Sequence, residues 1–220
     1  LIPEDDATLA RRGAVFLVCD GMGGHAAGQI ASELAAKTFL DVYYEHPGAD
    51  PAEALRAAVA AANRFVVSVG AAVPARRGMG TTLTGLVILQ DAAYLVHAGD
   101  SRLYRLRDGH LQQMSNDHTV MEEMVRTGVL TREQAANHPQ KHAILRCIGL
   151  PDGVEPDVER YDLLVGDRFF LCSDGVTNHV DDAAILRLMS THGPGESEIV
   201  IRVLLLPSWE TSCRDRGNLA

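Results

Sequence analysis

The chain has 220 residues, of which 46% are hydrophobic and 22% charged; this fits one globular domain with a sizeable core and excludes a disordered chain. Its formal net charge of −9 argues against nucleic acid as the main partner, because phosphate backbones select clustered Lys and Arg. No uninterrupted apolar stretch reaches the roughly 18 residues that a membrane helix needs, and residues 1–6 lack the basic start and apolar segment of a signal peptide. The scattered cysteines are interpreted as reduced thiols of a cytoplasmic protein; they are Cys19, Cys147, Cys172 and Cys213.

The first part of the chain predicts a strand followed by two helices. Residues 15–19 form an apolar run that reads as a buried strand, and it ends at Asp20. Three glycines and His25 follow within five residues, which lets the backbone approach a small polar ligand. Apolar residues then recur at helical spacing over 31–42 and over 55–69.

The second part predicts a β-meander and then further helices. The meander strands are expected at 82–89, 92–98, 102–106 and 110–114, with Asp108-Gly109 as a hairpin turn. The polar segment 115–150, with short helices at 120–127 and 131–137, is expected to pass over the sheet. A buried strand at 168–172 and helices at 182–189 and about 196–206 complete the prediction. This order of elements indicates an α+β fold with helices layered on sheets.

Three of the most apolar predicted strands end in an aspartate beside a glycine, namely Asp20, Asp100 and Asp174. One such junction is an ordinary turn, but three favour a common site, because neighbouring strands would bring the carboxylates to one end of the sheet. Unpaired carboxylates there would raise one another's pKa, and a divalent cation removes the conflict. Carboxylate and carbonyl oxygens favour Mg²⁺ or Mn²⁺, whereas zinc would favour closely spaced Cys and His.

Five motifs, in order, resemble those of the metal-dependent protein phosphatases of the protein phosphatase 2C type. They are Asp20-Gly21-Met22-Gly23-Gly24-His25, Gly78-Met79-Gly80-Thr81-Thr82, His97-Ala98-Gly99-Asp100-Ser101-Arg102, Asp117-His118-Thr119 and Ser173-Asp174-Gly175-Val176-Thr177. The resemblance spans residues 15 to about 190, and Met22 resembles the bacterial branch of the family. It implies a four-layer αββα sandwich with the site at one end of two packed sheets.

The resemblance also implies a function and roles for individual residues. A centre of two Mn²⁺ or Mg²⁺ ions, with a weaker third, would hydrolyse phosphoserine and phosphothreonine in proteins phosphorylated by a Ser/Thr kinase. By position, Asp20 resembles the ligand bridging two ions, Gly21 would donate its carbonyl, and Asp174 would bind the second ion. Asp100, with Asp174, resembles the third site, and 115–150 corresponds to the flap beside the cleft.

Histidines and threonines near these motifs receive supporting roles. His25 is the candidate general acid for the leaving oxygen, because an imidazole titrates near neutral pH; a structural role for His25 is the equal alternative. His118 is interpreted as ordering the start of the flap, and Thr81 and Thr82 as holding groups near the metals.

Two motifs that the resemblance leads one to expect are missing from the sequence. They are an upstream Arg with an Asn-x-Asp, and an Asp-Asn pair after the last helix; Asp215 lies near the second position but is followed by Arg216. The sequence is therefore expected to be one phosphatase-like domain over 1–220 that lacks the terminal strands. We expect a parent protein that is an active phosphatase and a 220-residue segment that binds metal poorly.

Two other functions remain open from the sequence. A regulatory module without catalysis would keep the fold and the phosphoprotein partners. A serine esterase of the GDS type is the second alternative, because Gly99-Asp100-Ser101 resembles the nucleophile block of that family.

Overall fold

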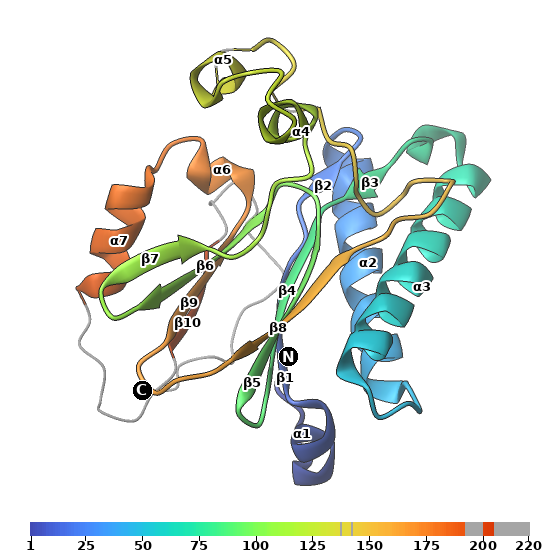
Figure 1. The fold of residues 1–220 in the computed structure, drawn as a ribbon. Coiled ribbons are helices and arrows are strands. Elements are labelled where there is room, and N and C mark those ends of the chain that lie inside the picture. Colours follow the sequence, from blue (N-terminus) through green and yellow to red (C-terminus); the bar gives the residue numbers. More distant parts are fainter. Residues whose placement is uncertain (137, 142, 192–199, 205–220) are drawn as a thin grey trace.

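The computed structural model describes residues 1–136, 138–141, 143–191 and 200–204. It contains two four-stranded sheets (Figure 1). The first sheet has the order β1-β4-β5-β8 and is antiparallel throughout. Its strands are β1 (Ala14–Val18), β4 (Leu83–Leu89), β5 (Ala92–Ala98) and β8 (Asp157–Asp162).

The second sheet has the order β10-β9-β6-β7. Its strands are β6 (Arg102–Arg107), β7 (His110–Gln113), β9 (Arg168–Cys172) and β10 (Val200–Leu204), and β10 pairs with β9 in parallel. A separate short ladder joins β2 (Gly21–Met22) to β3 (Gly80–Thr81), just beyond the end of β1.

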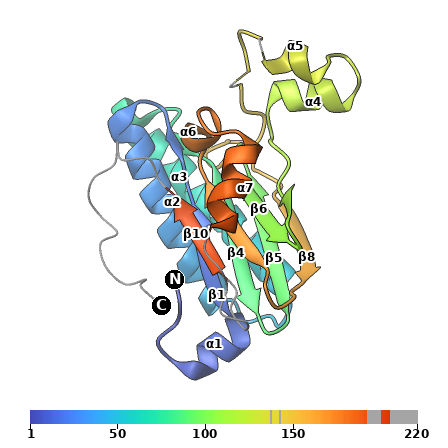
Figure 2. The same cartoon turned by 90° about the vertical axis from the view of Figure 1, so that its left-hand side faces the viewer.

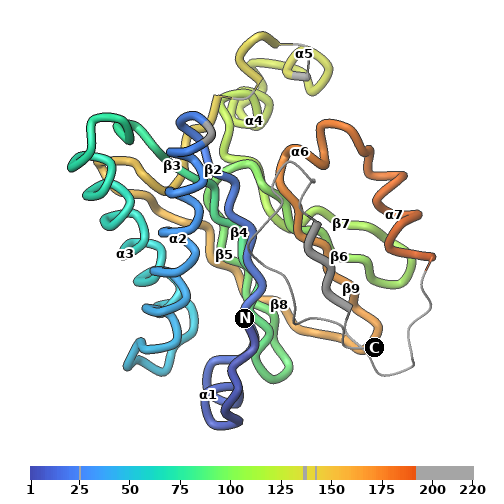
Figure 3. Tube along the Cα trace, turned by 180° about the vertical axis from the view of Figure 1, so that it is seen from behind, coloured from blue at the N-terminus to red at the C-terminus, as the bar shows by residue number. Residues whose placement is uncertain are grey.

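Helices cover the outer face of each sheet, as Figures 1 and 2 show. The long helices α2 (His25–Glu45) and α3 (Pro51–Ala72) pack on each other and on the first sheet. Helices α6 (Asp174–Thr177) and α7 (Asp182–Ser190) lie against the second sheet. Seen from behind in Figure 3, the α2–α3 pair and α7 stand on opposite sides of the strands. The predicted four-layer αββα sandwich is confirmed.

The alternation of side chains along the strands builds this layered core. On β9, Phe169 and Leu171 face the first sheet, whereas Phe170 and Cys172 face the outer helices. On β4, Leu86 lies between the sheets, and its neighbours along the strand pack under α2 and α3. Strands β4 and β9 therefore each contribute to two apolar layers, which explains why both read as nearly continuous apolar runs in the sequence.

The predicted meander is wrong at one connection. Strands β5 and β6 do not pair with each other; β5 belongs to the first sheet and β6 to the second. The chain crosses between the sheets at residues 99–101. Gly99 has φ +127, and a Cβ on it would lie 2.6 Å from the Cβ of Thr82. Only glycine fits this close approach, which brings the end of β5 against the start of β4.

The prediction that the three aspartates lie on neighbouring strands of a single sheet is therefore also wrong. Asp20 and Asp100 follow β1 and β5, which flank β4 and run in the same direction, whereas Asp174 follows β9 of the second sheet. The site is therefore built from both sheets, and Asp100 lies where the chain crosses between them.

The predicted final helix at about 196–206 is wrong over residues 200–204, where the chain forms β10. The β-branched residues of this stretch suit a strand, and β9 offers its edge for pairing. The remainder of the predicted helix lies outside the described residues. The elements that were not predicted from the sequence are α1 (Asp6–Arg12), the short strands β2 and β3, the short 3-10 helix η1 (Pro74–Arg76), β8 and α6. The flap helices α4 (Val120–Arg126) and α5 (Arg132–Ala136) lie close to their predicted positions.

One helix of the described chain, α3, is long and apolar enough by length and composition to cross a membrane. Its apolar face is buried in the core against α2 and the first sheet, as expected for a core helix of a folded domain. Cys19, Cys147 and Cys172 are free thiols, and Cys213 lies outside the described residues.

Candidate metal centre

Asp20 is held by its backbone at the end of β1. Its N–H donates to Oγ1 of Thr82 over 2.9 Å, and its carbonyl accepts from the N–H of Thr82 over 2.9 Å. The hydroxyl of Thr81 lies 3.0 Å from the same carbonyl. Because both threonines are buried, these bonds are shielded from water and fix the direction in which the carboxylate leaves the strand. Thr81 and Thr82 therefore hold the Asp20 backbone.

Replacing Thr82 by the isosteric valine is expected to destabilise the fold by about 1–2 kcal/mol, because it leaves the partly buried N–H of Asp20 without an acceptor. The change also removes the 2.8 Å contact between Thr82 Oγ1 and Ser101 Oγ. Urea unfolding measures the loss of stability, with Thr38→Val on α2 as a matched control that breaks no such bond. Equal stability of the two variants would contradict the role assigned to Thr82.

Asp100 follows β5 at the crossing between the sheets, where His118 holds the preceding glycine. The N–H of His118 donates to the carbonyl of Gly99 over 2.7 Å, and the N–H of Gly99 donates to His118 Nδ1 over 3.3 Å. Nε2 of His118 lies 3.1 Å from Oδ2 of Asp157. Because Nδ1 accepts, Nε2 carries the proton and donates to Asp157. His118 thus ties the start of the flap to the residue next to Asp100.

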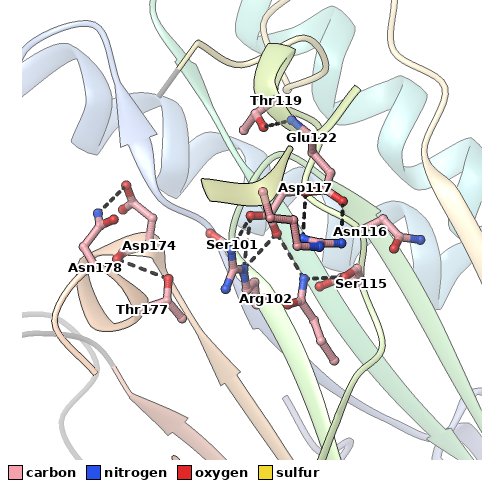
Figure 4. A network of polar contacts seen from close by, with 12 residues as sticks. Ser101, Arg102, Ser115, Asn116, Asp117, Thr119, Glu122, Asp174, Thr177 and Asn178 are labelled. Atoms are coloured by element: carbon pink, nitrogen blue, oxygen red, sulfur yellow. Dashed lines mark hydrogen bonds and ion pairs between the residues drawn. The ribbon is translucent and has the colours of Figure 1, made fainter. Parts of the chain in front are cut away.

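Asp174 begins α6 at the end of β9. The side-chain amide of Asn178, four residues later, donates to Oδ2 of Asp174 over 3.2 Å (Figure 4). Residues four apart on a helix face the same side. The spacing of Asp174 and Asn178 could therefore have identified Asn178 from the sequence, where it was missed.

Electrostatic interactions link the three aspartates. Burial, followed by the negative charge of Asp174, raises the pKa of Asp20 to about 6. Burial, followed by the charges of Asp174 and Asp117, raises the pKa of Asp100 to about 7, and Asp20 adds to this effect. The structure therefore brings together the carboxylates that the sequence predicted to converge, although they arrive from two sheets.

Such a donor set fits a hard divalent cation. Oxygen ligands of carboxylates are those that Mg²⁺ and Mn²⁺ prefer, and a cation would relieve the repulsion that raises the pKa of Asp20 and Asp100. Among the described residues, however, no group of three or more His, Cys, Asp or Glu side chains lies close enough to hold an ion. The aspartates fit the metal by their chemistry and form a partial set of ligands.

A cleft opens beside these carboxylates, and we call it the acidic cleft. It is lined by Asp100, Arg102, Asp117, Thr119, Lys141, Asp174, Thr177 and Asn178. Arg102 forms a two-pronged ion pair with Asp117 (Figure 4): its Nε lies 2.9 Å from Oδ1 and its Nη2 2.6 Å from Oδ2. The charge of Arg102 is therefore already used within the protein. The sequence placed both residues in motifs without predicting this pair.

The remaining predicted site residues lie on β2 and α2. Gly21 packs directly against α2, since a Cβ on it would lie 2.0 Å from the carbonyl oxygen of Gly28. The role of its carbonyl as a metal ligand stays a prediction. His25 is the first residue of α2, five residues beyond Asp20, and its side chain lies outside the described residues. Asp215 also lies outside them.

The model of the protein phosphatase 2C family matches residues 2–195, a span that includes Asp20, Asp100 and Asp174. The chain belongs to the protein phosphatase 2C family. The serine/threonine protein phosphatase PstP of Mycobacterium tuberculosis is 40% identical over 183 residues, which is 83% of this chain and 35% of that protein. The chain thus spans about a third of the length of this relative.

Two solved structures of the same family share the fold. The serine/threonine phosphatase of S. agalactiae has a TM-score of 0.76 at 34% identity and covers 83% of this chain, which in turn covers 76% of that one. The catalytic domain of PstP in complex with two manganese ions has a TM-score of 0.69 at 39% identity, with 79% of this chain and 72% of that one covered. The resemblance found in the five motifs is confirmed.

Family membership and the position of Ser101 together argue against the serine esterase alternative. Ser101 is fully buried, and its hydroxyl contacts Thr82 at 2.8 Å. A serine nucleophile needs an adjacent base and access to substrate. Among the described residues, the hydrogen-bond partner of the Ser101 hydroxyl is a threonine, so the side chain serves to join the two sheets.

Proposed function

We propose that this member of the protein phosphatase 2C family is a metal-dependent enzyme that hydrolyses phosphoserine and phosphothreonine in proteins. The observation that carries the proposal is the convergence of Asp20, Asp100 and Asp174 at one end of the sandwich. The printed names of its relatives, serine/threonine phosphatases, support the substrate class. The manganese complex of PstP supports dependence on a divalent ion.

In this proposal the three aspartates and Gly21 hold Mn²⁺ or Mg²⁺. Asp20 would hold both ions, the carbonyl of Gly21 would hold one of them, and Asp174 would hold the other; Asp100, with Asp174, would hold a weaker third. When bound, such ions lower the pKa of a water and stabilise charge on phosphoryl oxygens. Thr81 and Thr82 keep the Asp20 backbone in place for this task, and His118 does the same for the residue before Asp100.

His25 is proposed as the general acid. The proposal is supported by its position in the chain: His25 begins α2, directly after the β2 segment that follows Asp20. An imidazole there can donate a proton to the leaving serine or threonine oxygen, since its ordinary pKa lies near neutral pH.

The proposal extends to the biological setting. The substrates are phosphoproteins, the targets of a Ser/Thr kinase, and the reaction takes place in the bacterial cytoplasm. The proposed unit is one phosphatase domain over residues 1–220, with 115–150 as its flap. Nucleic acid is not proposed as a partner, given the net charge of −9.

The test is phosphate release from a phosphothreonine peptide by the 220-residue chain, with Mn²⁺, with Mg²⁺ and with EDTA. Release that requires the divalent ion is the expected result. Phosphopeptide binding without release at any metal concentration would contradict the enzymatic proposal, and it would favour a regulatory module. This second candidate is favoured by one observation, the incomplete set of metal ligands among the described residues.

A further inference from the structure

The flap carries four basic side chains, and three of them have a carboxylate partner. Arg126 pairs with Glu123 at 2.6 Å, and Arg132 pairs with Glu122 at 3.2 Å. At the base of the flap, Arg146 pairs with Asp157 at 3.1 Å. The fourth, Lys141, has no acidic partner among the residues that the structure describes. It is also the only one of the four that lines the acidic cleft.

The backbone of Lys141 is held in a compact turn. Its N–H donates to the carbonyl of His138 over 3.1 Å, and the N–H of Gln140 donates to Nδ1 of the same histidine over 3.2 Å. The next described residue, Ala143, accepts a backbone hydrogen bond of 2.8 Å from Val120 at the start of α4. The turn therefore fixes where the lysine stem begins, while the exposed ammonium remains free to reach a ligand.

Among the described residues that line it, the acidic cleft has three aspartates and one cation without an acidic partner, Lys141. Asp100, Asp117 and Asp174 are only partly exposed, and Arg102 is bound to Asp117. Lys141 and Asn178 are the exposed lining residues, one on the flap and one at the end of α6. Lys141 thus lines the cleft as an exposed side chain, which we call its rim, whereas the carboxylates of the proposed metal site are more buried.

From this arrangement we infer that Lys141 selects phosphoprotein segments that carry an acidic side chain next to the phosphorylated residue. This inference rests on the proposed phosphatase function. When the phosphoryl group lies beside the partly buried aspartates of the cleft, an Asp or Glu next to the phosphorylated residue of the substrate lies close to Lys141. The ammonium of Lys141 attracts it there, and it offsets the repulsion between an acidic substrate and the aspartates below.

The experiment compares two phosphothreonine peptides that differ only in the residues beside the phosphothreonine, acidic in one and neutral in the other, together with p-nitrophenyl phosphate. Lys141→Ala is expected to lower kcat/KM for the acidic peptide about two- to fivefold, the range of an exposed ion pair. Lys141→Glu is expected to lower it about tenfold, because attraction is replaced by repulsion. In both variants, kcat/KM for the neutral peptide and for p-nitrophenyl phosphate is expected to stay within about twofold of wild type. Lys141→Arg is expected to retain the preference for the acidic peptide.

Lys37, the other lysine of the sequence, provides the matched control. It is exposed on α2 and does not line the acidic cleft, so Lys37→Glu makes the same change in net charge elsewhere. If Lys37→Glu shifts the peptide preference as much as Lys141→Glu, the effect is one of overall charge and the inference is overturned. An equal loss for all three substrates in Lys141→Glu would overturn it as well, because Lys141 would then act on the phosphoryl group.

A binding measurement separates failure of this inference from failure of the proposed function. A wild-type chain that releases no phosphate from any substrate would overturn the proposed function. Fluorescence anisotropy with the two labelled phosphopeptides still tests Lys141 in that case. The expected result is tighter binding of the acidic peptide by wild type and loss of this preference in Lys141→Glu. Equal binding of both peptides by wild type would overturn the inference.

Discussion

Replacing Asp174 by asparagine is expected to lower metal-dependent phosphate release at least about 100-fold. Replacing a residue that only supports a metal ligand already lowers metal affinity or activity about 10- to 100-fold, and Asp174 is proposed as a ligand itself. The substitution keeps the shape of the side chain and removes its charge. It also keeps an oxygen that can accept from Asn178, whose amide lies 3.2 Å from Oδ2. A lower activity therefore reports on the charge of Asp174 rather than on a collapse of α6.

The control for this variant is Asp152→Asn, in an exposed turn outside the acidic cleft. It makes the same change in net charge and is expected to leave the rate of phosphate release unchanged. Asp152→Asn should unfold as the wild type does, and Asp174→Asn should be at least as stable as the wild type, because it removes a charge that repels Asp20 and Asp100. If Asp174→Asn keeps more than half of the wild-type activity, the assignment of Asp174 to the metal centre is wrong.

Replacing Asp100 by asparagine is expected to stabilise the metal-free protein at pH 8 by about 1–2 kcal/mol. Burial and the neighbouring aspartates raise the pKa of Asp100 to about 7 in the folded chain, against about 3.9 in an unfolded one. At a pH between these two pKa values, Asp100 is protonated in the folded state and ionised in the unfolded state. The free energy of unfolding therefore falls as the pH rises from about 4 to 7, and asparagine removes this loss.

Urea unfolding in EDTA at pH 5 and pH 8 measures the effect. Wild type is expected to be less stable at pH 8 than at pH 5, and the difference is expected to be smaller in Asp100→Asn. Lower stability of the variant at pH 8 would show that Asp100 is favourably paired in the fold. The same substitution should weaken Mn²⁺ binding, so stability and metal affinity are expected to change in opposite directions.

The strands that carry the aspartates were predictable because their composition leaves little choice. Strands β5 and β9 have the predicted bounds, since an apolar run between polar turns admits a buried strand. Strand β8 was missed because Asp157–Asp162 is mostly polar and lies at the edge of the first sheet. The sequence predicts a helix where β10 lies, because a short apolar run fits either structure until a partner strand is known.

For the candidate site, the sequence predicted which carboxylates would converge, but it did not predict which sheets would supply them. The repeated strand-to-aspartate junctions identified Asp20, Asp100 and Asp174. That Asp174 belongs to a different sheet from Asp20 and Asp100 depends on the strand pairing, and the crossing beside Asp100 depends on how closely Gly99 packs on Thr82. Contacts between distant segments, such as Arg102 with Asp117 or Lys141 at the acidic cleft, arise only once the chain is folded.

The most direct test of the metal centre is calorimetric titration of the 220-residue chain with Mn²⁺, beside Asp20→Asn. Asp20 is the residue assigned to bridge the ions, and its backbone is fixed by Thr81 and Thr82 independently of its carboxylate. We predict that the wild type binds Mn²⁺, weakly because the described ligands form a partial set, and that Asp20→Asn does not bind it. Equal binding by the two proteins, or no binding by the wild type, would contradict the account.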